Sequence, residues 1–175
     1  MKTAFASDTR FMDHDTGIGH PERPARLSHT LAHLKSKPWF SSLQMMSGVE
    51  CNRDQISSMH DEGLIDRAQT SCAQGLSYLD SPDVVISPDS FDIARLAVGT
   101  VLSLSDAIVS GQVNNGFALI RPPGHHAERN EALGFCLFNN IAITARYLQQ
   151  QHGLERILIV DWDVHHGNGT QHLFE

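Results

Sequence analysis

The sequence predicts an α/β fold in which helices cover a parallel β-sheet. Short apolar runs that are typical of buried strands occur at residues 117–120 and 156–160. A helix-length segment, residues 139–151, lies between them and is followed by Gly153. A polar loop follows each apolar run. Strand, loop, helix, strand and loop in this order form the βαβ unit of a parallel sheet.

Two further elements are predicted in the first part of the chain. Residues 3–6 form a short apolar run that indicates a first strand, and a polar loop follows it. Residues 20–24 open a helix of about twelve residues, because leucines then recur on one face. Pro38 ends this helix, since proline cannot continue the helical hydrogen-bonding pattern.

The middle of the chain contains one strong helix signal and three weaker signals. The weaker ones predict a strand and two short helices, at residues 43–47, 54–60 and 63–74. The strong signal covers residues 91–110, where apolar residues recur along one helix face. Ser90 precedes this helix as a candidate N-cap residue, and Gly111 follows it.

The composition fits an ordinary globular domain, since 41% of the 175 residues are hydrophobic and 19% are charged. The formal net charge is −7 and no basic tract stands out, which argues against binding to nucleic acid through phosphate contacts. The acidic excess weakly favours a cationic substrate, although such an excess also simply aids solubility.

The cysteines and the N-terminus indicate the cellular compartment. The three cysteines are odd in number and widely spaced, which predicts neither a disulfide framework nor a CxxC metal site. The first residues contain too short an apolar run for a signal peptide. No run approaches the roughly 20 apolar residues that span a membrane. We therefore expect a cytoplasmic protein with no membrane partner.

The densest group of ionisable residues follows the apolar run at residues 156–160. Asp161, Asp163 and His165 alternate, so they share one side if the extended conformation continues. Carboxylate oxygen and neutral imidazole nitrogen both suit zinc, so this spacing resembles a cradle for a divalent metal. A single Asp or His at this place is more often a turn former or helix cap. Four ionisable residues in six positions are costly to bury without a metal.

A second histidine pair follows the apolar run at residues 117–120. Because ligands sit at the carboxyl ends of strands in parallel sheets, we expect the two loops to meet at one sheet edge. The converging side chains predict the site of a metal-dependent hydrolase. They are His125, His126, Asp161, Asp163, His165 and His166.

Other ligating or nucleophilic side chains lack such a context. Cys136 is predicted to be a packed thiol rather than a nucleophile. The histidines outside the motifs are expected on the surface or in the core with satisfied hydrogen bonds: His14, His29, His33, His60, His152 and His172.

Four motifs carry a family resemblance. They are His20-Pro-Glu-Arg-Pro-Ala-Arg-Leu27, Arg121-Pro-Pro-Gly-His-His126, Gly134-Phe-Cys-Leu-Phe-Asn-Asn140 and Asp161-Trp-Asp-Val-His-His-Gly-Asn-Gly-Thr170. Together they resemble the histone deacetylase family, which includes acetylpolyamine amidohydrolases and acetoin-utilisation proteins. At residues 162 and 168 the chain is more similar to class II and bacterial members. Class I members usually carry Asp where this chain has Asn168.

The resemblance implies a three-layer α-β-α fold of the arginase/deacetylase type, with a mainly parallel sheet. It implies that Asp163 and His165 are two of three zinc ligands. It further implies that Asp161 pairs with His125 and helps to bind a structural potassium ion.

The same resemblance implies roles for residues around the metal. His126, paired with its neighbouring histidine, is the general base for the attacking water and later the acid for the leaving amine. Asn168 orients His126. Gly134 and Phe135 line a narrow channel for the acylated side chain, although a lone Phe135 would more often pack in the core. Arg23 supports the inner pocket.

Two family features are missing from residues 1–175. In the family, the third zinc ligand (an Asp) and the tyrosine that stabilises the oxyanion lie downstream of residue 175. Tyr78 and Tyr147 lack the glycine-rich setting of that tyrosine. The resemblance therefore implies that residues 1–175 are the N-terminal portion of a single deacetylase domain, inactive alone and with its C-terminal part absent.

The sequence thus supports one main function and two alternatives. The main one is a zinc-dependent hydrolase that removes acetyl or short acyl groups from lysine side chains or polyamines. The first alternative is a non-catalytic fragment that binds acyl-lysine or another protein. An arginase-type binuclear manganese hydrolase is a weaker alternative. The metal-binding motifs of such enzymes are rich in Asp, whereas a Pro-Gly-His-His loop supplies the acid–base pair here. The choice of substrate and the oligomeric state stay open.

Overall fold

Three parallel strands form the central sheet of the computed structural model, which describes residues 1–175. They are β1 (Thr3–Ala6), β2 (Gln44–Met46) and β3 (Asn115–Ala118), in the order β2-β1-β3. In this register Phe5 lies opposite Met45 on one side and Phe117 on the other. The predicted parallel sheet is confirmed, and so are the strands expected at residues 3–6 and 43–47. The strand expected at residues 117–120 exists but begins two residues earlier and ends at Ala118, and it is not buried as predicted, since Phe117 is 54% exposed.

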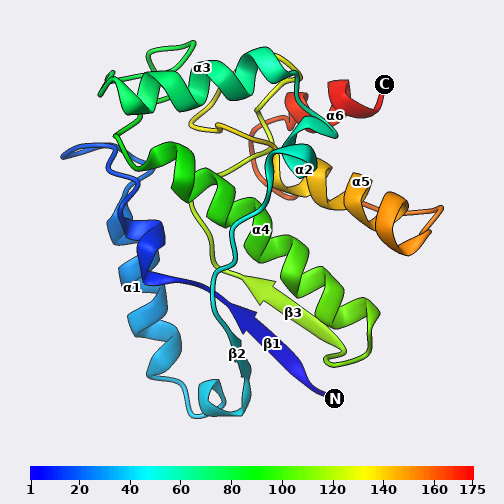
Figure 1. Ribbon diagram of the computed structural model, residues 1–175. Coiled ribbons are helices and arrows are strands. Elements are labelled where there is room, and N and C mark those ends of the chain that lie inside the picture. The colour runs from blue at the N-terminus through cyan, green and yellow to red at the C-terminus, as the bar shows by residue number, and fades with distance from the viewer.

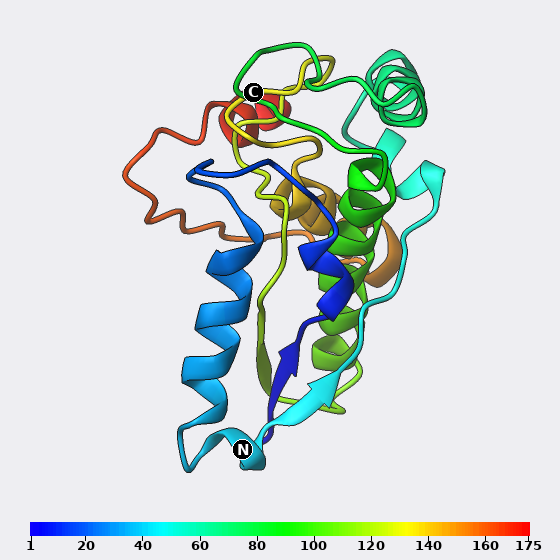
Figure 2. The same cartoon turned by 90° about the vertical axis from the view of Figure 1, so that its left-hand side faces the viewer.

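Helices cover both faces of this sheet (Figure 1). Figure 2 shows α1 (Pro24–Lys35) on one side of the strands and α4 (Ser90–Val109) on the other. The fold is therefore a three-layer α/β architecture with an open parallel sheet. The other helical segments are η1 (Thr9–Met12), η2 (Phe40–Ser42), α2 (Arg53–Ser57), α3 (Glu62–Ala73), α5 (Asn140–His152) and α6 (Asn168–Phe174).

Helix α4 is the longest helix and packs against the sheet. Its 20 residues bury an apolar face that includes Ala97 and Leu104, as the periodicity of residues 91–110 predicts. Gly99 lets a neighbouring segment approach closely, because a Cβ there would lie 2.2 Å from the carbonyl oxygen of Val49. Ser90 is not the N-cap residue. It lies in the first turn, where its buried hydroxyl accepts a hydrogen bond from the Ser87 N–H at 2.7 Å.

Helix α5 carries cap residues at both ends, which explains why its bounds follow from the sequence. The Asn139 side chain accepts a hydrogen bond from the Ala142 N–H at 3.0 Å, as an N-cap residue does. Gly153 ends the helix in the left-handed conformation with φ 66°. The helix predicted at residues 139–151 is confirmed.

The strand predicted at residues 156–160 is wrong. The segment forms no strand and pairs with no neighbour, and Leu158 and Val160 are 86% and 70% exposed. A β-strand needs a hydrogen-bonded partner strand, and an apolar run cannot supply that partner by itself. Figure 2 shows the segment as part of an orange-to-red loop that projects away from the sheet.

The largest part of the hydrophobic core lies among the helices rather than on the sheet. Twenty buried residues form it, and α3, α4 and α5 contribute side chains such as Leu64, Val98 and Ile143. The three cysteines are buried free thiols. None of the helices has the length and apolar character that crossing a membrane requires.

Candidate active site

Two loops meet to form the candidate site. The first loop, residues 119–139, follows β3, and the second loop, residues 153–167, connects α5 to α6. Nδ1 of His125 in the first loop lies 2.7 Å from Oδ2 of Asp161 in the second loop. Nδ1 of His126 lies 2.6 Å from Oδ1 of Asn168, the first residue of α6. The two loops therefore converge as the sequence predicts, although the second loop follows no strand.

A glycine in the motif of residues 161–170 lets α6 touch the first loop. A Cβ at Gly169 would lie 2.2 Å from the carbonyl oxygen of Ala127, so any side chain would push the two elements apart. The Thr170 N–H donates to the carbonyl oxygen of His125 at 3.2 Å. Close packing of α6 therefore fixes the main chain of the histidine pair.

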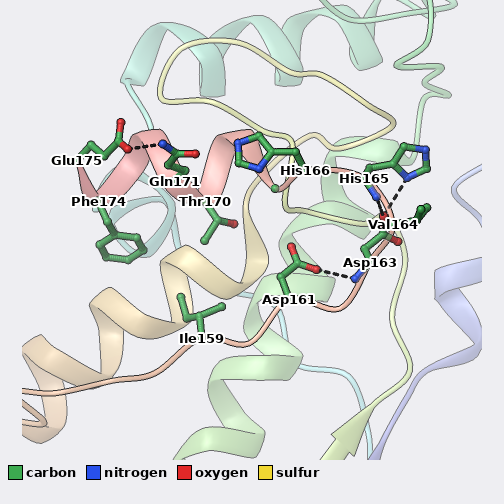
Figure 3. A pocket seen from close by; sticks show the side chains of 11 residues that line it. Ile159, Asp161, Asp163, Val164, His165, His166, Thr170, Gln171, Phe174 and Glu175 are labelled. Carbon is green, nitrogen blue, oxygen red and sulfur yellow. Dashed lines mark hydrogen bonds and ion pairs between the residues drawn. The ribbon is translucent and has the colours of Figure 1, made fainter.

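The histidine pair borders a cavity of about 490 Å³. The rings of His125 and His126 both line it, with centroids 4.1 Å apart. Residues from distant parts of the sequence complete the wall: Pro21, Glu22, Arg26, Asp83, Pro123, Gly134, Phe135, Asp163 and His165. A second cavity of about 600 Å³ is drawn in Figure 3, and Asp163 and His165 line both cavities.

Hydrogen bonds within the second loop arrange its acidic residues (Figure 3). The Asp163 N–H donates to Oδ1 of Asp161 at 3.1 Å, and the His165 N–H donates to Oδ1 of Asp163 at 2.8 Å. The N–H and the ring of His165 hold the pKa of the Asp163 carboxyl below its usual value. Partial burial raises the pKa of Asp161, but hydrogen bonds from His125 and Asp163 outweigh it and lower that pKa. Both carboxylates therefore carry charge at neutral pH.

Asp163 and His165 present two donor atoms of the kind that zinc binds. Oδ1 of Asp163 and Nδ1 of His165 lie 2.9 Å apart. Neighbouring donors in a tetrahedral zinc site with bonds of about 2.0–2.1 Å lie about 3.3 Å apart. No group of three His, Cys, Asp or Glu side chains could hold a metal ion. The two atoms are of a type that zinc binds, but here they face each other across a hydrogen bond, so the structure contains two candidate donors and no complete zinc site.

Gly134 and Phe135 both line the cavity, as expected, and both have left-handed backbone conformations with φ 55° and 69°. A Cβ at Gly134 would lie 2.2 Å from Cδ2 of His126, so glycine is needed for this approach. The Phe135 ring packs edge-on against His20, with centroids 4.8 Å apart. The Gly134 N–H donates to Oδ2 of Asp83 at 3.0 Å, which fixes this turn.

Two residues lie elsewhere than the sequence suggests. Arg23 is exposed at the N-cap of α1 and does not line the cavity, whereas Arg26 does. The extended backbone of Arg23 precedes the helix, and three further residues bring Arg26 round to the cavity. His166 lines the second cavity and not the one that contains the histidine pair.

A buried ion pair beneath the cavity was not predicted. Nε and Nη2 of Arg121 each donate to the Glu22 carboxylate at 2.7 Å, and Nη1 donates to the Phe11 carbonyl oxygen at 2.8 Å. Both charged side chains are only 2% exposed. Burial raises the pKa of Glu22, but the Arg121 guanidinium outweighs this effect and lowers that pKa. The sequence contained one sign of this ion pair: Glu22 and Arg121 are oppositely charged residues that lie inside two of the four motifs.

Two histidines outside the motifs are buried and hydrogen-bonded, which confirms that part of the prediction. Nδ1 of His14 lies 2.7 Å from Oγ of Ser90. Nδ1 of His60 donates to the Glu128 carbonyl oxygen at 2.7 Å, and Nε2 accepts from the Asn139 N–H at 2.9 Å. Burial lowers the pKa of each imidazole to about 4.

Cys136 lies next to the cavity but is fully buried. Burial raises the pKa of its thiol to about 12. The thiolate that nucleophilic attack requires is therefore absent at neutral pH. The prediction of a packed thiol is confirmed.

Comparison with known proteins identifies the family. The family model for the histone deacetylase domain matches residues 20–175. The chain belongs to the histone deacetylase family. This family hydrolyses acetyl amides and is generally zinc-dependent.

Several relatives of this histone deacetylase chain are closely similar. Polyamine deacetylase HDAC10 of Rattus norvegicus is 45% identical over 159 residues, which cover 88% of this chain and 27% of that protein. Uncharacterized protein slr0245 of Synechocystis is 42% identical over 175 residues, which cover 98% of this chain and 57% of that protein. The crystal structure of the HDA15 HD domain superposes with a TM-score of 0.93 at 39% identity, covering 99% of this chain and 49% of that one. The chain thus spans between about a quarter and about half of these relatives.

Proposed function

We propose that this chain forms part of the active site of a zinc-dependent amide hydrolase. Its substrates are acetyl or short acyl amides of lysine side chains or polyamines. The observation that carries this proposal is that the histidine pair His125–His126 and the two zinc-type donors, Asp163 and His165, line one cavity. The name of the rat relative, polyamine deacetylase, supports acetylpolyamines as one substrate class.

Asp163 and His165 would hold the zinc ion through the two donor atoms that lie 2.9 Å apart. A third ligand would come from outside residues 1–175, as would the donor that stabilises the oxyanion. Bound zinc supplies a Lewis acid for the acyl carbonyl and lowers the pKa of water. Asp161 would hold His125 and share a structural potassium ion with Asp163. In this proposal residues 1–175 are the N-terminal portion of one deacetylase domain and do not turn over substrate alone.

His126 is the proposed base. Its Nδ1 pairs with Asn168, and no protein group hydrogen-bonds its Nε2. Nε2 can therefore take a proton from the attacking water and return it to the leaving amine. His125 differs, because a charged carboxylate lies at its Nδ1. Asp161 keeps the proton of the ring on Nδ1 and holds the ring in place.

The cavity wall suits a long methylene chain that ends in an amide. Phe135 presents aromatic surface at one side, backed by the His20 ring, and Gly134 keeps this wall close to His126. The Phe135 ring would pack against the methylene stem of lysine or of a polyamine, and the amide would lie next to the histidine pair. Both substrate classes share this chemistry.

Zinc affinity tests the metal site, and it should be measured in the longer protein that supplies the third ligand. Competition with a chromophoric chelator should show binding that Asp163→Ala and His165→Ala abolish. His29→Ala is the matched control, because His29 is exposed on α1 and should leave zinc affinity unchanged. His126→Ala should retain zinc but lose turnover in protein that is active. Equal zinc affinities for all variants would overturn the proposed ligands.

One observation favours a second function for the chain by itself. Only two donors of a zinc site are present, so residues 1–175 could bind acyl-lysine without turnover. Binding of an acetyl-lysine peptide by the zinc-free chain, unaffected by Asp163→Ala, would support that function. Peptide binding that requires zinc would instead support the hydrolase.

A further inference from the structure

We propose that Glu128 is a positioning residue for the base His126, which it controls through Asn168. Oε1 of Glu128 accepts a hydrogen bond from Nδ2 of Asn168 at 2.5 Å. Oδ1 of the same amide lies 2.6 Å from Nδ1 of His126. Because His126 is the base only in the function proposed above, the catalytic consequence rests on that proposal.

An amide does not by itself decide which imidazole nitrogen carries the proton. The oxygen of Asn168 accepts and its nitrogen donates, and the two ends are nearly equal in size. With the oxygen toward His126, Nδ1 is protonated and Nε2 is the free base. With the nitrogen toward His126, Nδ1 must accept, and Nε2 carries the proton. Only the first arrangement leaves a base facing the cavity.

Glu128 removes this ambiguity because a carboxylate only accepts hydrogen bonds. The end of the Asn168 amide near Glu128 must therefore be the N–H₂ group, which turns the oxygen toward His126. The opposite orientation would place two acceptor oxygens 2.5 Å apart. The carboxylate also polarises the amide, so its oxygen becomes a stronger acceptor for His126.

Glu128 is itself held in place. Its carbonyl oxygen accepts from the buried His60 ring at 2.7 Å, and its N–H donates to the Glu131 carbonyl oxygen at 2.9 Å. Nδ1 of His172 on α6 lies 2.9 Å from the same Oε1 that binds Asn168. The side chain is 19% exposed, so solvent competes little for the carboxylate.

The neighbouring histidine provides an internal comparison. His125 contacts the Asp161 carboxylate directly at 2.7 Å, so its tautomer is fixed without any further residue. His126 instead contacts the neutral amide of Asn168, and the carboxylate of Glu128 lies one hydrogen bond further away. The two histidines thus reach the same tautomer by different means, and only His126 depends on Glu128.

The protonation of the two ring nitrogens of His126 can be measured directly by NMR. Long-range ¹H–¹⁵N correlation spectra of the ¹⁵N-histidine-labelled chain distinguish protonated from free nitrogens, and they need neither zinc nor substrate. In the unmodified chain we expect His126 to be protonated at Nδ1. In Glu128→Ala we expect the Nε2-protonated form of His126 to appear, while His125 keeps its pattern. Glu131→Ala, an exposed glutamate in the same loop, should change neither ring.

Two further variants keep the test decisive. Glu128→Gln preserves the shape but can present an N–H₂ group to Asn168, so it too should populate the Nε2-protonated form. Asn168→Asp places an acceptor beside His126 permanently, so combining it with Glu128→Ala should restore the Nδ1-protonated form. An unchanged His126 tautomer in both Glu128 variants would overturn the proposal.

Turnover separates this proposal from the proposed function. In zinc-loaded, active protein, Glu128→Ala should lower kcat by about 10- to 100-fold with little change in KM, as is usual for such supporting residues. A tautomer change with full activity in His126→Ala would retain the positioning and reject His126 as the base. Suppose instead that Glu128→Ala binds zinc, stays active and shows no tautomer change. That result would reject the positioning role of Glu128 and leave the proposed function intact.

Discussion

Nδ1 of His125 lies 2.7 Å from Oδ2 of Asp161, although 36 residues separate them in the chain. A charged carboxylate only accepts hydrogen bonds, so His125 donates to Asp161. The other carboxylate oxygen accepts the N–H of Asp163 at 3.1 Å. Asp161 therefore orients both a histidine of the pair and the main chain at a proposed zinc ligand.

Asp161→Asn removes this charge and offers an N–H₂ group where His125 needs an acceptor. We expect zinc affinity to fall about 10- to 100-fold, as is usual when a partner next to metal ligands is lost. Chelator competition measures this affinity. Asp13→Asn is the control, because Asp13 is exposed and its carboxylate accepts no hydrogen bond. Equal affinities for the two variants would contradict this role of Asp161.

Gly134→Ala should disturb His126 specifically. The new Cβ would lie 2.2 Å from Cδ2 of that ring, and φ is 55°. Gly75→Ala is a matched control, because Gly75 has φ 67° and nothing within 4 Å of the added Cβ. Both variants should lose about 1–2 kcal/mol of unfolding free energy from the left-handed backbone. Only Gly134→Ala should shift the NMR signals of the His126 ring, and equal shifts would refute the contact.

Much of the fold follows from local signals in the sequence. Helix α5 has an Asn139 N-cap and a Gly153 C-cap, and α4 has a long apolar face, so their bounds need no tertiary information. The convergence of the two loops is predicted from a βαβ order, but the second strand of that order is absent, so the prediction is right without its structural reason. The features that do follow, the bounds of the two helices, are local.

What the sequence could not supply depends on partners distant in the chain. The run at residues 156–160 has strand composition but no neighbouring strand to pair with. The choice between Arg23 and Arg26 depends on where α1 begins relative to the cavity. Glu128 contacts Asn168 only because α6 packs onto the first loop. Composition and spacing do not encode these contacts directly.

The buried Glu22–Arg121 ion pair should be important for stability. Arg121→Met leaves the buried Glu22 carboxylate with only the exposed Arg26 guanidinium, at 3.0 Å, as a charged partner, and we expect a loss of about 3 kcal/mol of unfolding free energy. Combining it with Glu22→Gln should recover part of this loss, because the buried charge is then gone. Urea unfolding measures both variants.

An exposed arginine provides the control for that experiment. Arg53 pairs with Glu62 and Asp66 on the surface, where its side chain is 39% exposed. Arg53→Met should therefore cost no more than about 1 kcal/mol. A loss of the same size at Arg53 and Arg121 would contradict the distinction between the exposed and buried pairs.

The buried histidines predict how stability depends on pH. His14 and His60 have folded-state pKa values lowered from 6.5 to about 4 by burial. The unfolded chain therefore binds protons more readily than the folded chain between these values. Stability is fully present above pH 6.5 and falls as the pH decreases toward 4. At pH 5 the loss should be about 2 kcal/mol for each histidine.

Replacing one of these histidines isolates its share. His60→Leu removes the titrating group, so the difference in unfolding free energy between pH 7 and pH 5 should shrink by about 2 kcal/mol. Its absolute stability should fall as well, because the Glu128 carbonyl and the Asn139 N–H lose their partner.

His29→Gln, on the exposed face of α1, should leave the pH dependence unchanged. Carboxylates with lowered pKa, such as Glu22, act below about pH 4.5 and so leave this window to the histidines. An undiminished pH dependence in His60→Leu would show that this imidazole does not resist protonation in the folded chain.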